Sequence, residues 1–198
     1  MHKLVLFAAL ALCSLSLAAC GAQPAASQPN ASQTQTASQS TASQTAGSGL
    51  FSSFSAVDLD GNAVDASVLT GKKLTMVNVW ATYCGPCLRE MPDLGALSTQ
   101  YADKDVQVIG IVLDAFDGKT SIPSQVEVAK EIIAQTGADY LHLTPSKEMF
   151  ESTLRDVSAV PTTFFVDASG NVLGEPYLGA RSAGEWQQMI DGLLADRN

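Results

Sequence analysis

Cys84 and Cys87 are the residues in this sequence whose types and spacing point most directly to chemistry. Residues three apart on a helix share a face, so two thiols at this spacing can close a small disulfide ring. If a helix begins at Cys84, its free N–H groups and partial positive charge lower the thiol pKa from about 8.5 toward about 3.5–7.5. This predicts Cys84 as a nucleophile and Cys87, one turn further in, as the thiol that resolves a mixed disulfide.

A structural zinc site is the first alternative, because a Cys-x-x-Cys pair is also half of many zinc sites. The remaining cysteines, Cys13 and Cys20, lie in the N-terminal segment, and His142 is the only histidine beyond that segment. Four nitrogen or sulfur ligands therefore cannot be assembled within one chain. An inactive buried pair is the second alternative, and the strand-then-helix setting favours redox chemistry over both. His142, isolated in an apolar strand, is predicted to be a structural residue.

A strand followed directly by a helix must position the two cysteines. Residues 74–80 form an apolar, β-branched run that indicates a buried strand, and Gly85 and Pro86 open a helix over residues 84–101, which Pro92 should kink. Further patterns predict strands over residues 54–59, 106–113, 140–143 and 160–167, helices over 65–70, 124–136 and 145–154, a hairpin turn at 168–171 leading into 172–173, and a last helix opened by a capping box of Ser182 and Glu185. Strands that alternate with helices predict an α/β domain.

Two neighbouring motifs, at residues 79–87 and 88–92, resemble those of a known protein family. Val-Trp-Ala-Thr-Tyr-Cys-Gly-Pro-Cys at residues 79–87 resembles the thioredoxin active site, and Leu-Arg-Glu-Met-Pro at 88–92 resembles the extracytoplasmic TlpA/ResA/CcmG branch of that superfamily. The resemblance implies a thioredoxin-like fold, with a central mixed β-sheet flanked by helices, an N-terminal hairpin and a TlpA-type insertion at residues 140–154. It also implies an active-site wall made of Trp80, Tyr83, Gly85, Pro86, Val160 and Pro161.

Val160 and Pro161 open the second motif, Val-Pro-Thr-Thr-Phe-Phe-Val-Asp. A proline is tolerated at the first position of a strand, where no ladder donor is needed. X-Pro bonds in folded proteins are cis in only about 5–6% of cases. In thioredoxin-like folds, however, the corresponding bond is cis and lies against the cysteines, so the resemblance implies a cis Val160-Pro161 bond.

Asn78 departs from the cytoplasmic thioredoxin pattern, in which a buried aspartate handles the proton of the second cysteine. Glu90 lies three residues after Cys87 on the same helical face, where the ResA-like branch carries a glutamate. Glu90 could therefore take over the proton handling. An ordinary first-turn glutamate, favoured by the helix dipole, is the alternative.

The N-terminal segment predicts export and a lipid anchor. Residues 1–19 combine Lys3 with an apolar run shorter than the roughly 20 residues of a membrane-spanning helix, as in a secretory signal. Leu17-Ala18-Ala19-Cys20 resembles the bacterial lipobox, which implies that Cys20 is lipidated; ordinary signal cleavage is the alternative. Residues 20–49 contain no charged or aromatic side chain and predict a flexible tether. Residues 50–198 would then form the thioredoxin-like domain at the extracytoplasmic face of the cell membrane.

Composition narrows the possible functions further. The formal net charge is −9, and a chain without a basic cluster is a poor nucleic-acid binder, because binding requires cations that displace condensed counterions. The sequence has no nucleotide-binding glycine pattern and no metal-ligand cluster, so we expect no cofactor and no metal. The dithiol itself is then the redox group.

The resemblance implies a membrane-anchored, monomeric thiol-disulfide oxidoreductase that reduces disulfides of exported proteins. An apocytochrome c, a methionine sulfoxide reductase and a pool of misoxidised proteins all fit as substrates, and a membrane carrier of the CcdA/DsbD type fits as electron donor. An SCO-like copper protein is an alternative, although it uses Cys-x-x-x-Cys and a distant histidine. A peroxiredoxin would need a lone cysteine in a Pro-x-x-x-Thr-x-x-Cys setting, which is absent. A non-catalytic binding module stays open if the pair remains oxidised.

Overall fold

A computed structural model of the chain describes residues 49–197. The predicted signal segment, the predicted lipidation site at Cys20 and the part of the predicted tether before Gly49 lie outside the described residues. Within residues 49–197, no helix combines the length and the apolar character needed to cross a membrane.

A mixed seven-stranded sheet forms the centre of the fold, in the strand order β2-β1-β5-β4-β3-β6-β7. The strands are β1 (Ser55–Asp58), β2 (Ala63–Asp65), β3 (Leu74–Trp80), β4 (Val106–Val112), β5 (Leu141–Pro145), β6 (Thr162–Val166) and β7 (Tyr177–Leu178). Strands β3, β4 and β5 are mutually parallel, and the outer strands pair antiparallel. The predicted N-terminal hairpin is present as β1 and β2.

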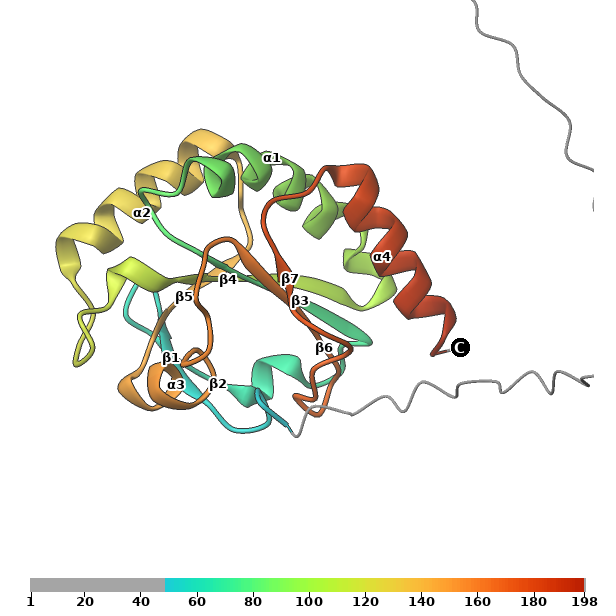
Figure 1. The fold of residues 1–198 in the computed structure, drawn as a ribbon, viewed down its shortest axis with the longest axis horizontal. Helices are drawn as coiled ribbons and strands as arrows, with labels where there is room; N and C mark the ends of the chain where they lie inside the picture. Colours follow the sequence, from blue (N-terminus) through green and yellow to red (C-terminus); the bar gives the residue numbers. More distant parts are fainter. Residues whose placement is uncertain (1–48, 198) are drawn as a thin grey trace, which may run out of the picture. The chain divides into compact units, whose positions relative to one another are not determined.

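Helices cover both faces of this sheet (Figure 1). The α-helices are α1 (Gly85–Gln100), α2 (Pro123–Thr136), α3 (Lys147–Ser152) and α4 (Ala183–Ala195), and 3-10 turns span Ala66–Leu69, Ala102–Lys104 and Leu113–Ala115. Helices α1, α2 and α4 lie along one face, and α3 packs with β1 and β5 on the other. Between β4 and β6 the chain adds α2, β5 and α3, with β5 extending the sheet beside β4. The predicted thioredoxin-like fold is confirmed.

Strand β3 is buried along its whole length because both of its faces are covered. Val77 and Val79 point into the apolar cluster on the α3 side, whereas Met76 belongs to the cluster beneath α1 and α4. Trp80, at the end of the strand, belongs to a third cluster that contains both cysteines. Each fully buried side chain of this size contributes about 1.5–3 kcal/mol, so the core fixes the strand that leads into the Cys-x-x-Cys segment.

Helix boundaries follow the local signals in the sequence. Cys84 is the N-cap of α1, and Pro86 lies in the first turn, where its missing N–H costs nothing. Pro92 lies inside the helix. The capping box of Ser182 and Glu185 opens α4, as predicted.

The terminal hairpin differs from the prediction. The turn at residues 168–171 forms, but Val172 makes only an isolated bridge to Val166. The strand that pairs regularly with β6 on the side away from β3 is Tyr177–Leu178. Gly174 adopts a φ of 76°, and Pro176 has no N–H to donate to a ladder. These two residues interrupt the returning strand before it can pair regularly.

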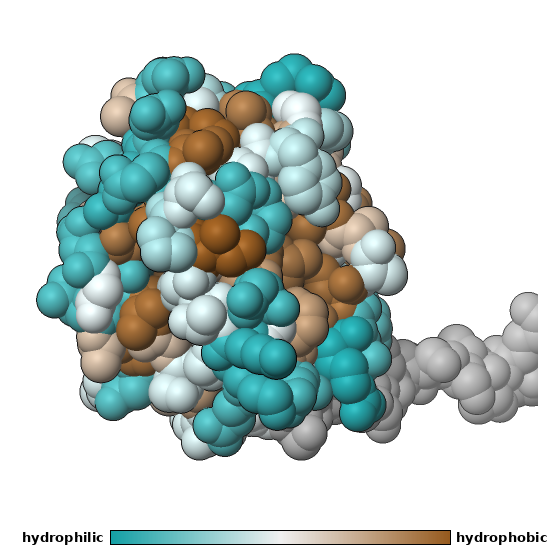
Figure 2. All heavy atoms as spheres, turned by 90° about the vertical axis from the view of Figure 1, so that its left-hand side faces the viewer, coloured by the Kyte–Doolittle hydropathy of each residue, from teal (hydrophilic) through white to brown (hydrophobic). Residues whose placement is uncertain are grey.

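The surface mixes polar and apolar side chains. Figure 2 shows hydrophobic patches that are broken up by hydrophilic groups on the face it presents. Within residues 49–197, the large apolar side chains with the greatest exposure are Tyr83 at 75%, Leu178 at 60%, Val128 at 39% and Phe150 at 37%. Tyr83 stands out among them because it directly precedes Cys84.

Candidate active site

Cys84 and Cys87 form a disulfide at the start of α1, with their Cα atoms 5.3 Å apart. The backbone N–H of Cys87 donates to the sulfur of Cys84 at 3.2 Å. The helix terminus therefore supplies a donor directly to the atom that would carry a thiolate charge. Cys84 is 6% exposed and Cys87 is fully buried, so only Cys84 can be reached from the surface.

The Val160-Pro161 peptide bond is cis, as the resemblance implied. It faces the cysteines, because the carbonyl oxygen of Val160 lies 3.6 Å from the sulfur of Cys84. Gly179 lies beside it, and its N–H donates to the carbonyl of Pro161 at 2.9 Å. The cis-proline segment thus forms one side of the site.

The remaining predicted wall residues divide into a surface group and a buried one. Tyr83, Gly85 and Pro86 are exposed around Cys84. Trp80 is fully buried and packs in the same cluster as the two cysteines. It therefore supports the disulfide from inside, and the surface rim is made by Tyr83, Gly85 and Pro86.

Glu90 is a buried carboxyl group, 3% exposed, on the inner face of α1. The side-chain amide of Asn78 donates to Oε1 at 3.0 Å, and the backbone N–H of Arg181 donates to Oε2 at 3.1 Å. The same amide nitrogen of Asn78 also donates to Thr163 at 3.0 Å. Asn78, at the position of the thioredoxin aspartate, therefore holds the glutamate in place.

Burial raises the pKa of Glu90 above its usual range, because desolvation penalises the ionised form. The N–H groups of Arg181 and Asn78 that donate to the carboxylate oppose this rise in pKa. The nearby Trp186 indole opposes it as well, although its N–H makes no hydrogen bond of normal geometry. The buried Tyr140 hydroxyl has no hydrogen-bond partner, and the charge of Glu90 adds to the burial that raises the pKa of this tyrosine. The Glu90 carboxyl therefore holds a proton more readily than an exposed glutamate does.

His142 has the structural role that the sequence predicted. The Trp80 indole N–H donates to Nδ1 at 3.2 Å, so the ring proton sits on Nε2, which contacts the Ala138 carbonyl at 3.0 Å. Burial lowers the pKa of His142 to about 4. The ring is therefore neutral, and both of its nitrogens are occupied.

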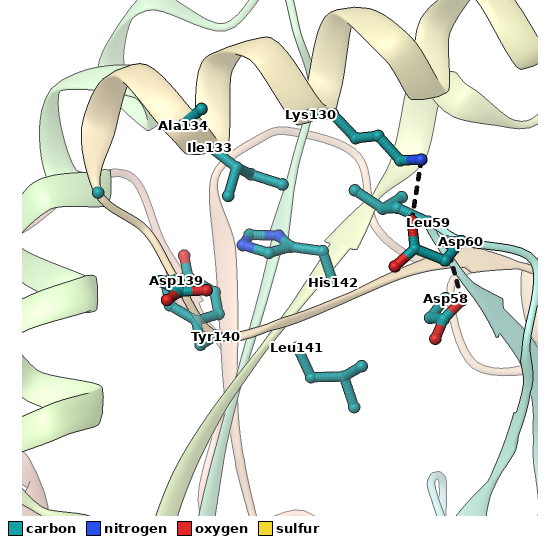
Figure 3. A pocket seen from close by; sticks show the side chains of 11 residues that line it. Asp58, Leu59, Asp60, Lys130, Ile133, Ala134, Asp139, Tyr140, Leu141 and His142 are labelled. Carbon is teal, nitrogen blue, oxygen red and sulfur yellow. Dashed lines mark hydrogen bonds and ion pairs between the residues drawn. The ribbon is translucent and has the colours of Figure 1, made fainter.

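His142 also borders a pocket of about 580 Å³ between α2, β5 and the turn after β1 (Figure 3). Lys130 and Asp60 form an ion pair across this pocket, with a nitrogen-to-oxygen distance of 3.0 Å. Neither cysteine lines it. This cavity is therefore separate from the Cys84–Cys87 disulfide.

Two neighbours of the site were not foreseen from the sequence. Thr82 is hydrogen-bonded to Asp114, which follows β4. The carboxyl ends of parallel strands meet at one edge of a sheet, and from this rule the proximity of Thr82 and Asp114 could have been predicted.

The second neighbour is Arg89, which folds back toward Gly85, so that a Cβ on the glycine would lie 3.4 Å from Nη1 of the arginine. Arg89 is exposed, and solvent screens the effect of its charge on Cys84.

Comparison with known proteins places the chain among redox proteins. The family described as Redoxin matches residues 30–180. This chain belongs to the Redoxin family. It is 27% identical over 142 residues to thiol-disulfide oxidoreductase ResA of Bacillus thuringiensis (strain Al Hakam), covering 72% of this chain and 73% of that protein. It is 28% identical over 138 residues to thioredoxin-like protein YneN of Bacillus subtilis (strain 168), covering 70% and 75% of the two chains.

A solved structure supports the same assignment. The thiol:disulfide interchange protein, a thioredoxin family protein from Chlorobium tepidum TLS, aligns with a TM-score of 0.59 and 29% identity, covering 72% of this chain and 93% of that one. The predicted membership of this Redoxin-family chain in the TlpA/ResA/CcmG-like branch of the thioredoxin superfamily is confirmed.

Proposed function

We propose that the chain is a thiol-disulfide oxidoreductase that reduces disulfides of exported proteins through Cys84 and Cys87. The observation that carries this proposal is the disulfide at the N-terminus of α1, of which only Cys84 reaches the surface. The named relatives are thiol-disulfide oxidoreductases and interchange proteins, which supports the same reaction class.

The reaction begins from the reduced dithiol. The Cys84 thiolate attacks one sulfur of the substrate disulfide, and the other substrate sulfur leaves as a thiolate that takes up a proton. The Cys87 thiol then loses its proton and attacks the Cys84 sulfur, which releases the second substrate thiol and leaves the Cys84–Cys87 disulfide. Two electrons pass to the substrate, and an external dithiol donor must return them.

The resolving step needs a proton acceptor, because Cys87 is fully buried. Glu90 is the buried acid on the same helix, and Asn78 cannot ionise. We assign proton handling to Glu90, as the resemblance to the ResA-like branch implies. Val160 and Pro161 present backbone beside Cys84, where an extended substrate segment would lie.

Trapping tests the division of labour between the cysteines. Cys84→Ser removes the nucleophile and should abolish reduction of a peptide disulfide. Cys87→Ser removes only the resolving thiol and should accumulate mixed disulfides on Cys84, visible on non-reducing gels and identified by mass spectrometry. The double variant Cys84→Ser, Cys87→Ser is the control and should trap no partner. Equal trapping by the Cys84 and Cys87 variants would overturn the assignment.

Copper handling and passive binding remain the rivals to be measured. A copper protein of the SCO type needs a histidine ligand, and both ring nitrogens of His142 are already hydrogen-bonded. In a copper titration of the reduced protein, any bound copper should therefore have only the thiolates of Cys84 and Cys87 as protein ligands, with no histidine nitrogen. A peroxide assay should show no turnover, because the peroxiredoxin motif is absent. A non-catalytic module would keep its disulfide in the presence of excess dithiothreitol.

Export and membrane attachment complete the proposal. Cleavage before Cys20 and lipidation of its thiol would leave a tether over residues 20–49 and a thioredoxin-like domain over 50–198, facing the extracytoplasmic side. Donor and substrate would then be a CcdA/DsbD-type carrier and an exported protein such as an apocytochrome c or a methionine sulfoxide reductase. Cys20→Ser should abolish incorporation of labelled fatty acid and membrane fractionation; a soluble wild-type protein with a free Cys20 thiol would contradict the anchor.

A further inference from the structure

We propose that Asp114 is a positioning residue that fixes the loop carrying Tyr83 and Cys84, so that this loop presents a preformed docking rim to protein substrates. This inference rests on the proposed function and deepens it. It concerns how the substrate is bound, not which bond is broken. The Asp114 carboxylate is hydrogen-bonded to Thr82 and Gln125 and not to either cysteine, so it acts through Thr82.

Three polar groups converge on the Asp114 carboxylate. The backbone N–H of Thr82 donates to Oδ1 at 3.0 Å, and the Thr82 hydroxyl donates to Oδ2 at 2.5 Å. The side-chain amide of Gln125 donates to Oδ2 at 3.1 Å. Asp114 lies in the 3-10 turn after β4, and Gln125 lies in the first turn of α2. One carboxylate therefore ties the loop after β3 to the two elements beside it.

The tied loop is short and carries the exposed rim. A hydrogen bond of 3.0 Å from the N–H of Cys84 to the Ala81 carbonyl closes the turn at its far side. Thr82 is bonded from both its backbone and its side chain, while the next residue, Tyr83, is 75% exposed. A ring with so little burial cannot hold its own backbone in place. The orientation of Tyr83 is therefore set by the bonds of Thr82.

Releasing the loop that carries Tyr83 and Cys84 should weaken the binding of protein substrates. Hydrogen bonds to an ionised carboxylate are stronger than neutral ones, and removing the carboxylate leaves the half-buried groups of Thr82 and Gln125 without their acceptor. A substrate that docks on a mobile rim must order it, and that entropy reduces affinity. A small disulfide that reaches Cys84 without contacting Tyr83 does not pay this cost.

An alternative is that the charge of Asp114 acts on Cys84 directly. Position and charge can be separated, because asparagine keeps the shape of aspartate. In Asp114→Asn the amide oxygen can still accept the Thr82 N–H, and the amide nitrogen can donate to the Thr82 hydroxyl. Asp114→Ala loses both bonds. Thr82→Val and Thr82→Ser form a second pair, which removes or keeps the hydroxyl while leaving the carboxylate ionised.

The experiment measures reduction of insulin with dithiothreitol as donor, alongside the rate at which each reduced protein reacts with 5,5′-dithiobis(2-nitrobenzoate). Asp114→Ala and Thr82→Val should raise the KM for insulin by about tenfold, the size expected for the loss of a hydrogen bond to a charged group. Their reaction with the small disulfide should stay close to the wild-type rate. Asp114→Asn and Thr82→Ser should restore most of the KM.

Two results would overturn the proposal. The first is an unchanged KM for insulin in either Asp114→Ala or Thr82→Val. The second is an Asp114→Asn variant as impaired as Asp114→Ala, which would point to charge. If Asp114→Ala does not fold, as judged by thermal unfolding, the Thr82 pair decides alone. Failure of the wild-type protein to reduce either disulfide would instead refute the proposed function.

Discussion

Glu90 is a carboxyl group that the chain buries at a cost. Its two oxygens accept bonds from Asn78 and from the backbone of Arg181, yet burial still raises its pKa. A buried carboxyl with a raised pKa is a suitable proton acceptor, because it holds a proton more readily than an exposed carboxyl does. The opposite interpretation, an ordinary acid near the helix N-terminus, fits less well, because such a group is stabilised in its ionised form.

The pH dependence of Glu90→Gln tests this interpretation. Because burial raises the pKa of Glu90 in the folded state, its contribution to stability is present below the unfolded pKa of about 4.3 and is lost as the pH rises through the folded pKa. Glutamine cannot ionise, so the free energy of unfolding of the variant should fall less with rising pH than that of wild type. The pH profile of Cys84 reactivity should also change.

Chemical denaturation and thiol alkylation between pH 4 and 9 provide these measurements. Glu131→Gln, which removes an exposed carboxylate on α2, is the matched control and should leave both profiles in place. If the pH profiles of stability and of Cys84 reactivity for Glu90→Gln coincide with those of wild type, Glu90 does not handle the proton and is an ordinary acidic residue near the helix N-terminus.

At the scale of elements, the approach of α1 to the end of α2 determines where the cysteines sit. Gly95 faces the C-cap of α2 so closely that a Cβ on it would lie 2.4 Å from the Gly137 carbonyl oxygen and 3.2 Å from the Ala138 Cα atom. Gly137 itself adopts a φ of 67°, which ends α2. The two helices can pack at this distance because Gly95 carries no side chain, whereas a Cβ on Gly137 would meet nothing within 4 Å.

Gly95→Ala should therefore destabilise the domain. The new methyl group meets backbone that cannot rotate away, so α1 must shift, at a cost of about 1–3 kcal/mol in the free energy of unfolding. Gly192→Ala is the matched control, because a Cβ there meets nothing within 4 Å in α4. It should stabilise by up to about 1 kcal/mol, since alanine favours helix more than glycine does. Urea unfolding of both variants measures the difference, and similar stabilities would contradict the packing argument.

At the scale of the whole molecule, the balance between reduced and oxidised forms sets the direction of the reaction. A strongly stabilised thiolate gives an oxidant such as DsbA at about −120 mV, whereas thioredoxin lies near −270 mV. In this chain the donor to the Cys84 sulfur is the Cys87 backbone N–H. Gly85 and Pro86 between the cysteines add no side-chain donor. The oxidised form is therefore not strongly disfavoured.

We expect a midpoint potential of roughly −220 to −280 mV, typical of a reducing protein. Equilibration of the protein against a dithiothreitol or glutathione series, read out by the fraction of reduced Cys84 and Cys87, measures it. Phe150→Ala, at an exposed site on α3, is a control that should leave the potential unchanged. A midpoint more positive than about −160 mV would instead favour a disulfide-forming role.

Local sequence signals were enough to predict most of the fold and the redox pair. The buried run at residues 74–80, the Gly85-Pro86 break and the capping box at Ser182 each act over a few residues, and the structure contains all three elements. The β7 strand was misplaced, because its pairing depends on where Gly174 and Pro176 let the chain rejoin β6.

By itself the sequence determined the α/β class and the strand-to-helix position of Cys84 and Cys87, since hydrophobic periodicity and helix capping are short-range properties. The candidate acid at Glu90 came from the resemblance to the ResA-like branch. Only the tertiary structure decided which groups surround them. Asp114 reaches Thr82 across 32 residues, and Arg181 reaches Glu90 across 91. Such contacts form when strands far apart in the chain pair in one sheet, and no local pattern encodes which side chains will then meet.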